Sequence, residues 1–315
     1  MRSRFGNFLN STAVTAAILV TTGGVAAAQS GGSATPAGSS AQQRAAGNMP
    51  QNGTARAEVA QLPAGPAARL TYADMAGLVE DAGIIAIAEV RRQSVVEAAR
   101  APGLAPGHAR LYLQGEVQAL LAAPGPVGQE LTFLADVPLD SRGRAPRLRR
   151  QRFVAFADPV PGRTGQVQLV EPDALIPADP AFEARLRQVI GQFAGADVPP
   201  PVTGVRDVLW TPGNLAGESE TQMFVETATG LPASISVVRR PGMAPQWGVS
   251  WSEIIDQSAT APAPDTPAWY RLACGLPRDL PADAFLQDPG SDRERARADY
   301  QLVVDSLGAC TRSRS

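Results

Sequence analysis

Apolar and polar residues alternate with a period of two along most of the chain between residues 83 and 170. A compact apolar run covers 83–90, and alternation marks further candidate strands at 111–121, 131–137, 153–155 and 167–169. Clusters of proline and glycine separate these segments, as is typical of short antiparallel strands joined by turns. Five strands in about 90 residues are typical of a small barrel or sandwich, so we expect a five-stranded antiparallel OB-like barrel.

Helix-start signals flank this β-rich region. Thr71 followed by Asp74 has the spacing of a capping box, and Asp179 followed by Pro180 is a strong N-terminal helix signal. The two helices and the barrel predict one domain over 67–196. Strand candidates at 205–210, 222–227, 234–239 and 247–251, followed by two helical segments, predict a second α+β domain with an antiparallel sheet over 197–315. The fold class is therefore mainly β with helices.

The chain contains two cysteines, Cys274 and Cys310, both in the C-terminal helical region. A disulfide between them would close a loop of about 36 residues and pin the C-terminal helices together. A reactive thiol is the alternative. It is disfavoured because the one histidine is far away in sequence and no local nucleophile motif surrounds either cysteine.

The first 66 residues carry the signals of export rather than of a fold. Arg2 and Arg4 precede a short apolar run, and small residues at 26–28 precede Gln29, which predicts a signal peptide over 1–28. Residues 29–66 are rich in Gly, Ser, Ala, Pro and Gln and predict a disordered linker. We expect a periplasmic or secreted protein after cleavage near Ala28–Gln29, with no stable membrane span in the mature chain.

Composition narrows the possible chemistry. With one His and two Cys, the chain cannot supply a multi-histidine cage or a four-thiolate zinc site, so we expect no metal and no cofactor. The net charge of −2 gives no general attraction to polyanions, and we expect no nucleic acid partner. The partner is unknown on these grounds. An anionic envelope component or another exported protein is the expected class.

Several stretches resemble known families. LADVPLDSRGRAPRLRRQRFVAF, TPGNLAGESETQMF and TPAWYRLAC resemble a family of uncharacterised exported alphaproteobacterial proteins over about residues 67–312. That resemblance implies export and no particular chemistry. The segments 128–133 and 152–156 resemble secreted OB-type barrels of the netrin and tissue-inhibitor kind, which implies a peptidase-inhibitor module as an alternative. The many cysteines of those inhibitors are absent here.

The most conspicuous cluster of one side-chain type is a run of arginines in the connection between two predicted strands. Its members are Arg142, Arg144, Arg147, Arg149, Arg150 and Arg152. Guanidinium groups bind phosphate and carboxylate in two-pronged geometry, so this run predicts an anion-binding loop. The alternative is a solvated hairpin whose arginines only discourage edge pairing or meet nearby carboxylates. The hypothesis that follows is a non-catalytic binding or envelope-associated module.

Catalytic interpretations find little support in the sequence, and we expect no catalytic residues. His108 lies in a turn-rich connection; Ser94 is a possible nucleophile, but no serine has a nucleophile-elbow motif around it. A hydrolase that uses Glu218, Glu220 or Glu253 as acid and base is the alternative function, because paired carboxylates across a cleft suit such chemistry. The interpretation without a function is that these acidic residues belong to a solvated loop before a strand.

Overall fold

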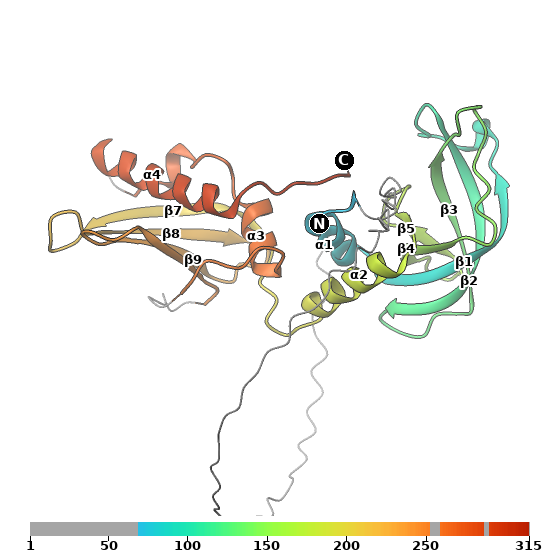
Figure 1. Ribbon diagram of the computed structural model, residues 1–315, viewed down its shortest axis with the longest axis horizontal. Helices are drawn as coiled ribbons and strands as arrows, with labels where there is room; N and C mark the ends of the chain where they lie inside the picture. The colour runs from blue at the N-terminus through green and yellow to red at the C-terminus, as the bar shows by residue number, and fades with distance from the viewer. Residues whose placement is uncertain (1–68, 253–258, 287–289, 315) are drawn as a thin grey trace, which may run out of the picture. The chain divides into compact units, whose positions relative to one another are not determined.

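The computed structural model describes residues 69–252, 259–286 and 290–314. The predicted signal peptide and linker lie outside these residues, as does Glu253. Within residues 60–315, which form one unit, the chain contains two antiparallel sheets with helices and belongs to the α+β class (Figure 1).

The first sheet has six strands in the order β3-β2-β1-β4-β5, and β6 also pairs with β4. Their bounds are β1 Ile84–Val95, β2 His108–Ala122, β3 Glu130–Pro138, β4 Arg152–Pro159, β5 Val167–Leu169 and β6 Leu175–Pro177. A short 3-10 helix, η2 (Ala98–Arg100), lies in the connection between β1 and β2. The five predicted strands are all present, and β1 continues five residues past its apolar run because β2 pairs with it as far as Val95.

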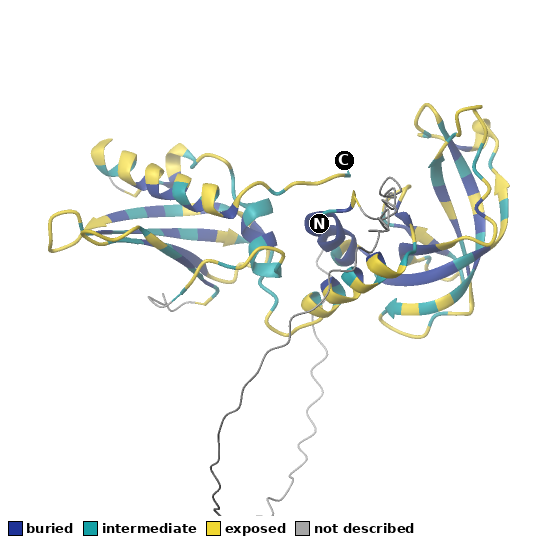
Figure 2. Cartoon of the chain, viewed as in Figure 1, coloured by how far each residue is buried: buried dark blue, intermediate teal, exposed yellow. Residues whose placement is uncertain are grey.

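The period-two pattern of the sequence is visible as alternating burial along β2 and β3 (Figure 2). Leu111 and Leu113 of β2 face the core together with Leu131 and Phe133 of β3, each at most 3% exposed. The neighbouring residues face outward, because successive side chains of a strand point to opposite sides of the sheet. The arginine-rich connection described below borders this outward face on the β1 side.

Helices α1 (Tyr72–Asp81) and α2 (Pro180–Phe193) pack against each other and belong to the core of the first sheet. The capping box of α1 is present: the Asp74 amide donates to Thr71 Oγ1 at 3.1 Å, and the Thr71 amide donates to Asp74 Oδ2 at 2.9 Å. Asp179 caps α2 through the Phe182 amide at 2.9 Å. Both local start signals are thus confirmed.

The second sheet has four strands in the order β10-β9-β8-β7. They are β7 Val202–Pro212, β8 Ser219–Thr227, β9 Ala233–Arg239 and β10 Gln246–Ser250, accompanied by α3 (Pro267–Gly275), the 3-10 helix η3 (Ala282–Ala284) and α4 (Gly290–Leu307). Helix α4 lies along β7 (Figure 1) and buries Tyr300 and Val303 in the core of this sheet. The proposed boundary between domains near residue 197 stays a prediction.

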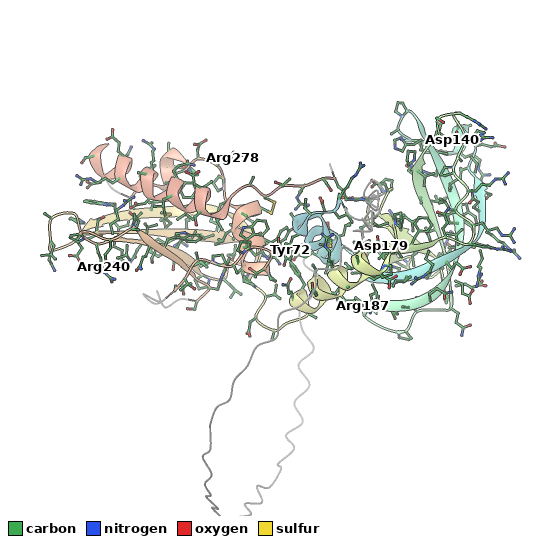
Figure 3. The ribbon with its side chains drawn as sticks, viewed as in Figure 1. Tyr72, Asp140, Asp179, Arg187, Arg240 and Arg278 are labelled. Atoms are coloured by element: carbon green, nitrogen blue, oxygen red, sulfur yellow. A yellow bond between two sulfur atoms is a disulfide. The ribbon has the colours of Figure 1, made fainter. Side chains whose placement is uncertain are left out.

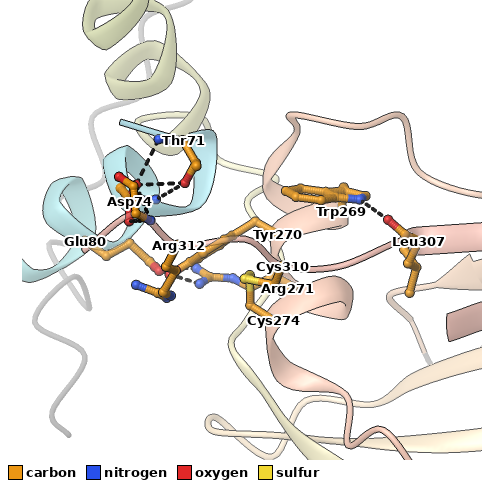
Figure 4. The surroundings of a disulfide bond; sticks show 11 residues. Thr71, Asp74, Glu80, Trp269, Tyr270, Arg271, Cys274, Leu307, Cys310 and Arg312 are labelled. Atoms are coloured by element: carbon orange, nitrogen blue, oxygen red, sulfur yellow. Dashed lines mark hydrogen bonds and ion pairs between the residues drawn. A yellow bond between two sulfur atoms is a disulfide. The ribbon is translucent and has the colours of Figure 1, made fainter. Parts of the chain in front are cut away.

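The disulfide between Cys274 and Cys310 is present and joins α3 to the segment after α4 (Figure 4). Beyond it the chain reaches α1, where the Ser313 hydroxyl donates to Asp74 Oδ2 at 2.6 Å and the Ser313 amide donates at 3.0 Å. The last described residues are therefore anchored at the start of the first helix. Among the described residues, no helix has the length and apolarity that a membrane crossing requires.

Candidate anion-binding site

The arginine-rich connection joins β3 to β4 and begins with a tight turn around Asp140, labelled in Figure 3. The Asp140 carboxylate accepts the backbone amides of Arg142 and Arg144, each at 2.9 Å, and Gly143 takes the left-handed conformation at φ 72°. These amide hydrogen bonds, above all that from Arg144, hold the pKa of Asp140 below its ordinary value. The first half of the connection is thus an ordered turn.

The second half of the connection is fixed to β1 by one side chain. The Gln93 amide donates to the Pro146 carbonyl at 2.9 Å, and its oxygen accepts the Leu148 amide at 2.6 Å. The Arg150 amide donates to the Val90 carbonyl at 2.8 Å, and Leu148 is 6% exposed. Beyond the end of its pairing with β4, β1 is therefore bordered by this connection.

Arg149 and Arg150 occupy a turn closed by the Gln151 amide, which donates to the Leu148 carbonyl at 2.9 Å. Arg150 has φ 67°, a left-handed conformation that costs a residue with a side chain about 1–3 kcal/mol. Glycine or asparagine is the usual occupant of such a position. The chain holds a long charged side chain where backbone geometry alone favours glycine.

The six arginines of the run divide into two groups. Arg152 pairs with Glu183 of α2 at 2.9 Å, and Arg144 lies 3.3 Å from Asp140. The other four, Arg142, Arg147, Arg149 and Arg150, are exposed. None of these four side chains has an acidic partner among the described residues. Only these four of the six arginines in the run are therefore available to bind an anion.

Two more arginines lie on the neighbouring stretch of β1. Arg91 pairs with Glu89 and Glu116, and the hydrogen bond that Arg91 donates to Glu116 raises the pKa of Arg91. Arg92 is exposed and, like the four above, has no acidic partner in the described part of the chain. Sequence reasoning missed Arg92, because only the pairing of the connection with β1 brings it beside the arginine-rich run.

The histidine and its possible nucleophile are not brought together. His108 Nδ1 lies 3.1 Å from the Pro106 carbonyl, a local contact within its own connection. Ser94 faces Tyr112 across the β1–β2 pair. Tyr112 is four residues along β2 from His108, which corresponds to about 13 Å. This geometry gives no support to a serine–histidine pair.

The acidic residues at the start of β8 make local hydrogen bonds. Glu218 accepts the amides of Asn214 and Leu215 and so shapes the β7–β8 turn. Glu220 accepts the side-chain amide of Gln222 at 3.0 Å. Because Glu253 lies outside the described residues, no described observation favours the hydrolase, and none favours the peptidase-inhibitor alternative.

No arginine of the run lines either of two hollows on the described surface, one beside β4 and β5 and one beside β7 and β8. The first, of about 440 Å³, has an acidic lining that includes Asp81, Asp158 and Glu171. Partial burial, together with the charges of Glu80 and Glu171, raises the pKa of Asp81. Within the described ranges, no group of three His, Cys, Asp or Glu side chains is placed to hold a metal ion. An anion on the arginine cluster would therefore lie on an open surface.

Comparison with known proteins adds no assignment, since no protein-family model matches the chain and no curated protein matches it significantly.

Proposed function

We propose that this protein is an exported, non-catalytic binding module that holds an anionic ligand on the connection between β3 and β4. The observation that carries the proposal is the group of Arg147, Arg149 and Arg150. All three are exposed on a connection whose backbone is fixed to β1, and none has a carboxylate partner among the described residues.

The ordering of the connection matters for affinity. A flexible arginine-rich loop would lose conformational entropy on binding, about 0.5–1.5 kcal/mol for each immobilised long side chain in addition to the backbone cost. Here Gln93 and the Val90 backbone already hold the main chain, so only the guanidinium side chains remain to be ordered. The strained Arg150 supports the same interpretation, because strain is retained where the surrounding structure enforces it and often accompanies function.

The test compares two triple variants of the mature chain with the same loss of charge. Arg147, Arg149 and Arg150 are changed to Gln in one, and Arg187, Arg240 and Arg278 in the other. The control residues are exposed and dispersed over the molecule (Figure 3). Binding to inorganic polyphosphate at low salt should fall roughly 10-fold in the first variant, about 1.4 kcal/mol, and less than twofold in the control. Equal losses, or no binding by the wild type to any polyanion tested, would refute the proposal.

We further propose that strands β1 to β5 close into an OB-like barrel. A parallel bridge between Thr132 of β3 and Gln166 before β5 supports closure, as does the Thr132 amide, which donates to the Gly165 carbonyl at 2.8 Å. The Asp136 amide donates to the Pro172 carbonyl at 2.7 Å on the same edge. Slow hydrogen exchange of the Thr132 and Asp136 amides would support the closed ring, and fast exchange at both would contradict it.

Export is the remaining part of the proposal and depends on residues 1–28. The positively charged start, the short apolar run and the small residues before Gln29 support it. Fractionation of cells and N-terminal sequencing test it directly. A mature chain that begins at or near Gln29 in the periplasm or medium is expected, and an uncleaved chain retained in the cytoplasm would contradict it.

A further inference from the structure

The outward face of the first sheet carries an exposed apolar pair in a central position. Tyr112 of β2 is 38% exposed and its cross-strand neighbour Leu134 of β3 is 47% exposed. On its other side Tyr112 faces Ser94 of β1. A row of three side chains, Ser94, Tyr112 and Leu134, therefore crosses the face from β1 to β3.

A second row runs parallel to the first, two residues along each strand. It consists of Arg92, Gln114 and Thr132, which are paired across β1, β2 and β3. Residues two apart on a strand share a face, so the apolar pair and Arg92 lie on one surface. Gln114 and Thr132 are partly exposed there. This row supplies a charge and two polar groups beside the aromatic ring.

The arginine-rich connection borders the same surface on the β1 side. Gln93, between the β1 members of the two rows, bonds the backbone of Pro146 and Leu148. Leu148 is buried, whereas Arg147 and Arg149 on either side of it are exposed at the level of Arg92 and Ser94. The face that carries the exposed tyrosine is therefore bordered on the β1 side by exposed arginines of two segments about 50 residues apart in sequence, none of which has an acidic partner among the described residues.

On the side of Tyr112 away from Arg92, the charge of Arg110 is neutralised by an aspartate. Arg110, two residues before Tyr112, binds both carboxylate oxygens of Asp136 at 2.7 Å. Beyond the Arg92 row, the next row on this face is Glu89, Glu116 and Glu130, of which Arg91 pairs with the first two. The positive charge beside Tyr112 therefore comes from Arg92 and from the arginine-rich connection on the β1 side. An occupant must therefore offer negative charge on one side and a ring or apolar surface against Tyr112 and Leu134.

We infer, on the basis of the proposed function, that this face binds an acidic polysaccharide. The ring of Tyr112 would contact the apolar side of a sugar ring, since aromatic side chains offer a flat apolar surface. The guanidinium groups of Arg92, Arg147 and Arg149 would bind its carboxylate or sulfate groups. Ser94 and Gln114 are placed to hydrogen-bond the hydroxyl groups between these charges.

Two features favour a polysaccharide over other anions. The surface is an open sheet face and neither described hollow includes it, which suits a chain laid across the strands better than a small enclosed ligand. Its apolar side chains project from a sheet face and not from a protruding loop or an amphipathic helix, so they are poorly placed to enter a lipid bilayer. A single exposed tyrosine also provides one ring contact rather than the series on which successive nucleic acid bases stack.

The test separates ring recognition from charge recognition. Polygalacturonate, which has sugar rings and carboxylates, is compared with inorganic polyphosphate, which has charge and no rings. Tyr112→Ala in the mature chain should weaken polygalacturonate binding about 5- to 10-fold and polyphosphate binding less than twofold. Tyr112→Phe should retain polygalacturonate binding, and Leu231→Ala, which removes an apolar side chain 58% exposed in the turn between β8 and β9, should change the binding of neither polymer.

The outcomes distinguish this inference from the proposed function. If Tyr112→Ala leaves polygalacturonate binding unchanged, or weakens both polymers equally, the polysaccharide assignment is wrong while arginine-dependent anion binding stands. The same holds if the wild type binds polyphosphate but not polygalacturonate. Tighter Tyr112-dependent binding to oligothymidylate or to phosphatidylglycerol vesicles than to polygalacturonate would also overturn the assignment. If the wild type binds none of these polyanions, the proposed function itself fails.

Discussion

Arg271 of α3 is a buried arginine that links α3 to α1 through an ion pair with Glu80 (Figure 4). Its side chain is 6% exposed, and its two terminal nitrogens donate to the two carboxylate oxygens of Glu80. Its Nε donates to the Pro199 carbonyl at 2.8 Å. The guanidinium also lies over the rings of Phe193 and Tyr270, at 5.5 and 5.6 Å from their centroids. We predict that Glu80→Gln, which keeps the size of the side chain and removes its charge, destabilises the fold.

The size of the destabilisation depends on how deeply each partner of the ion pair is buried. Removal of one partner of a fully buried ion pair costs about 3–5 kcal/mol, because the other charge is left without compensation. Glu80 is 27% exposed, so water partly replaces the lost charge and the cost falls to about 2–3 kcal/mol. The glutamine oxygen still accepts one hydrogen bond from Arg271, which keeps the loss below that of a truncation.

The measurement is the free energy of unfolding by urea, compared with a matched exposed pair. Glu116 pairs with Arg91 where both side chains are more than 40% exposed, so Glu116→Gln should cost at most about 0.5 kcal/mol. In an Arg271→Met background, Glu80→Gln should cost much less than in the wild type, since the buried charge is already gone. If Glu80→Gln costs no more than Glu116→Gln, the reasoning from buried charge is refuted.

Three further predictions concern the C-terminal anchor and the arginine-rich turn. Replacement of Cys274 and Cys310 by Ala should lower the unfolding free energy by about 3–4 kcal/mol, measured in urea without reductant, because the disulfide closes a loop of 36 residues. Burial raises the pKa of Asp74, but hydrogen bonds from Ser313 and Thr71 outweigh it and leave the pKa below its ordinary value. The contribution of Asp74 is thus present above about pH 4 and lost as pH falls through the folded pKa, so Asp74→Asn should be less stable than wild type at pH 7 and show a shallower loss on acidification. Arg150→Gly should stabilise the fold by roughly 0.5–1 kcal/mol by relieving the left-handed conformation, whereas Arg149→Gly should destabilise it; equal effects on the melting temperature would contradict this.

The local signals in the sequence predicted the elements well. The capping box at Thr71 and the Asp179–Pro180 start involve residues within three positions of each other, so their geometry depends little on the rest of the fold. Alternation is equally local, and it predicted the strands of both sheets except the three-residue β6, Leu175–Pro177. It fell short for β1, whose residues from Arg91 onward are polar and become a strand only because β2 pairs with them.

Buried polar groups were beyond the reach of the sequence. Asp299 of α4 is 1% exposed, accepts a hydrogen bond from Thr221 of β8 and pairs with Arg239 of β9 at 2.6 Å. An aspartate in a helix with many charged residues has the sequence pattern of a solvated surface. Only contact with two strands that lie 60 and 78 residues earlier shows that its charge is compensated in the core.

The arginine-rich connection shows why the candidate site could be predicted only in part. Its composition indicates anion binding but does not say which side chains are available, because acids from other elements neutralise some of them. Glu183 of α2 takes Arg152 out of the set, while the bonds of Gln93 to Pro146 and Leu148 bring Arg92 into it. Both effects depend on register between segments distant in sequence, which alternation alone leaves undetermined. Gln93→Ala should therefore weaken the binding of polyphosphate, even though Gln93 does not lie on the exposed rows, because the variant releases the backbone of the connection from β1.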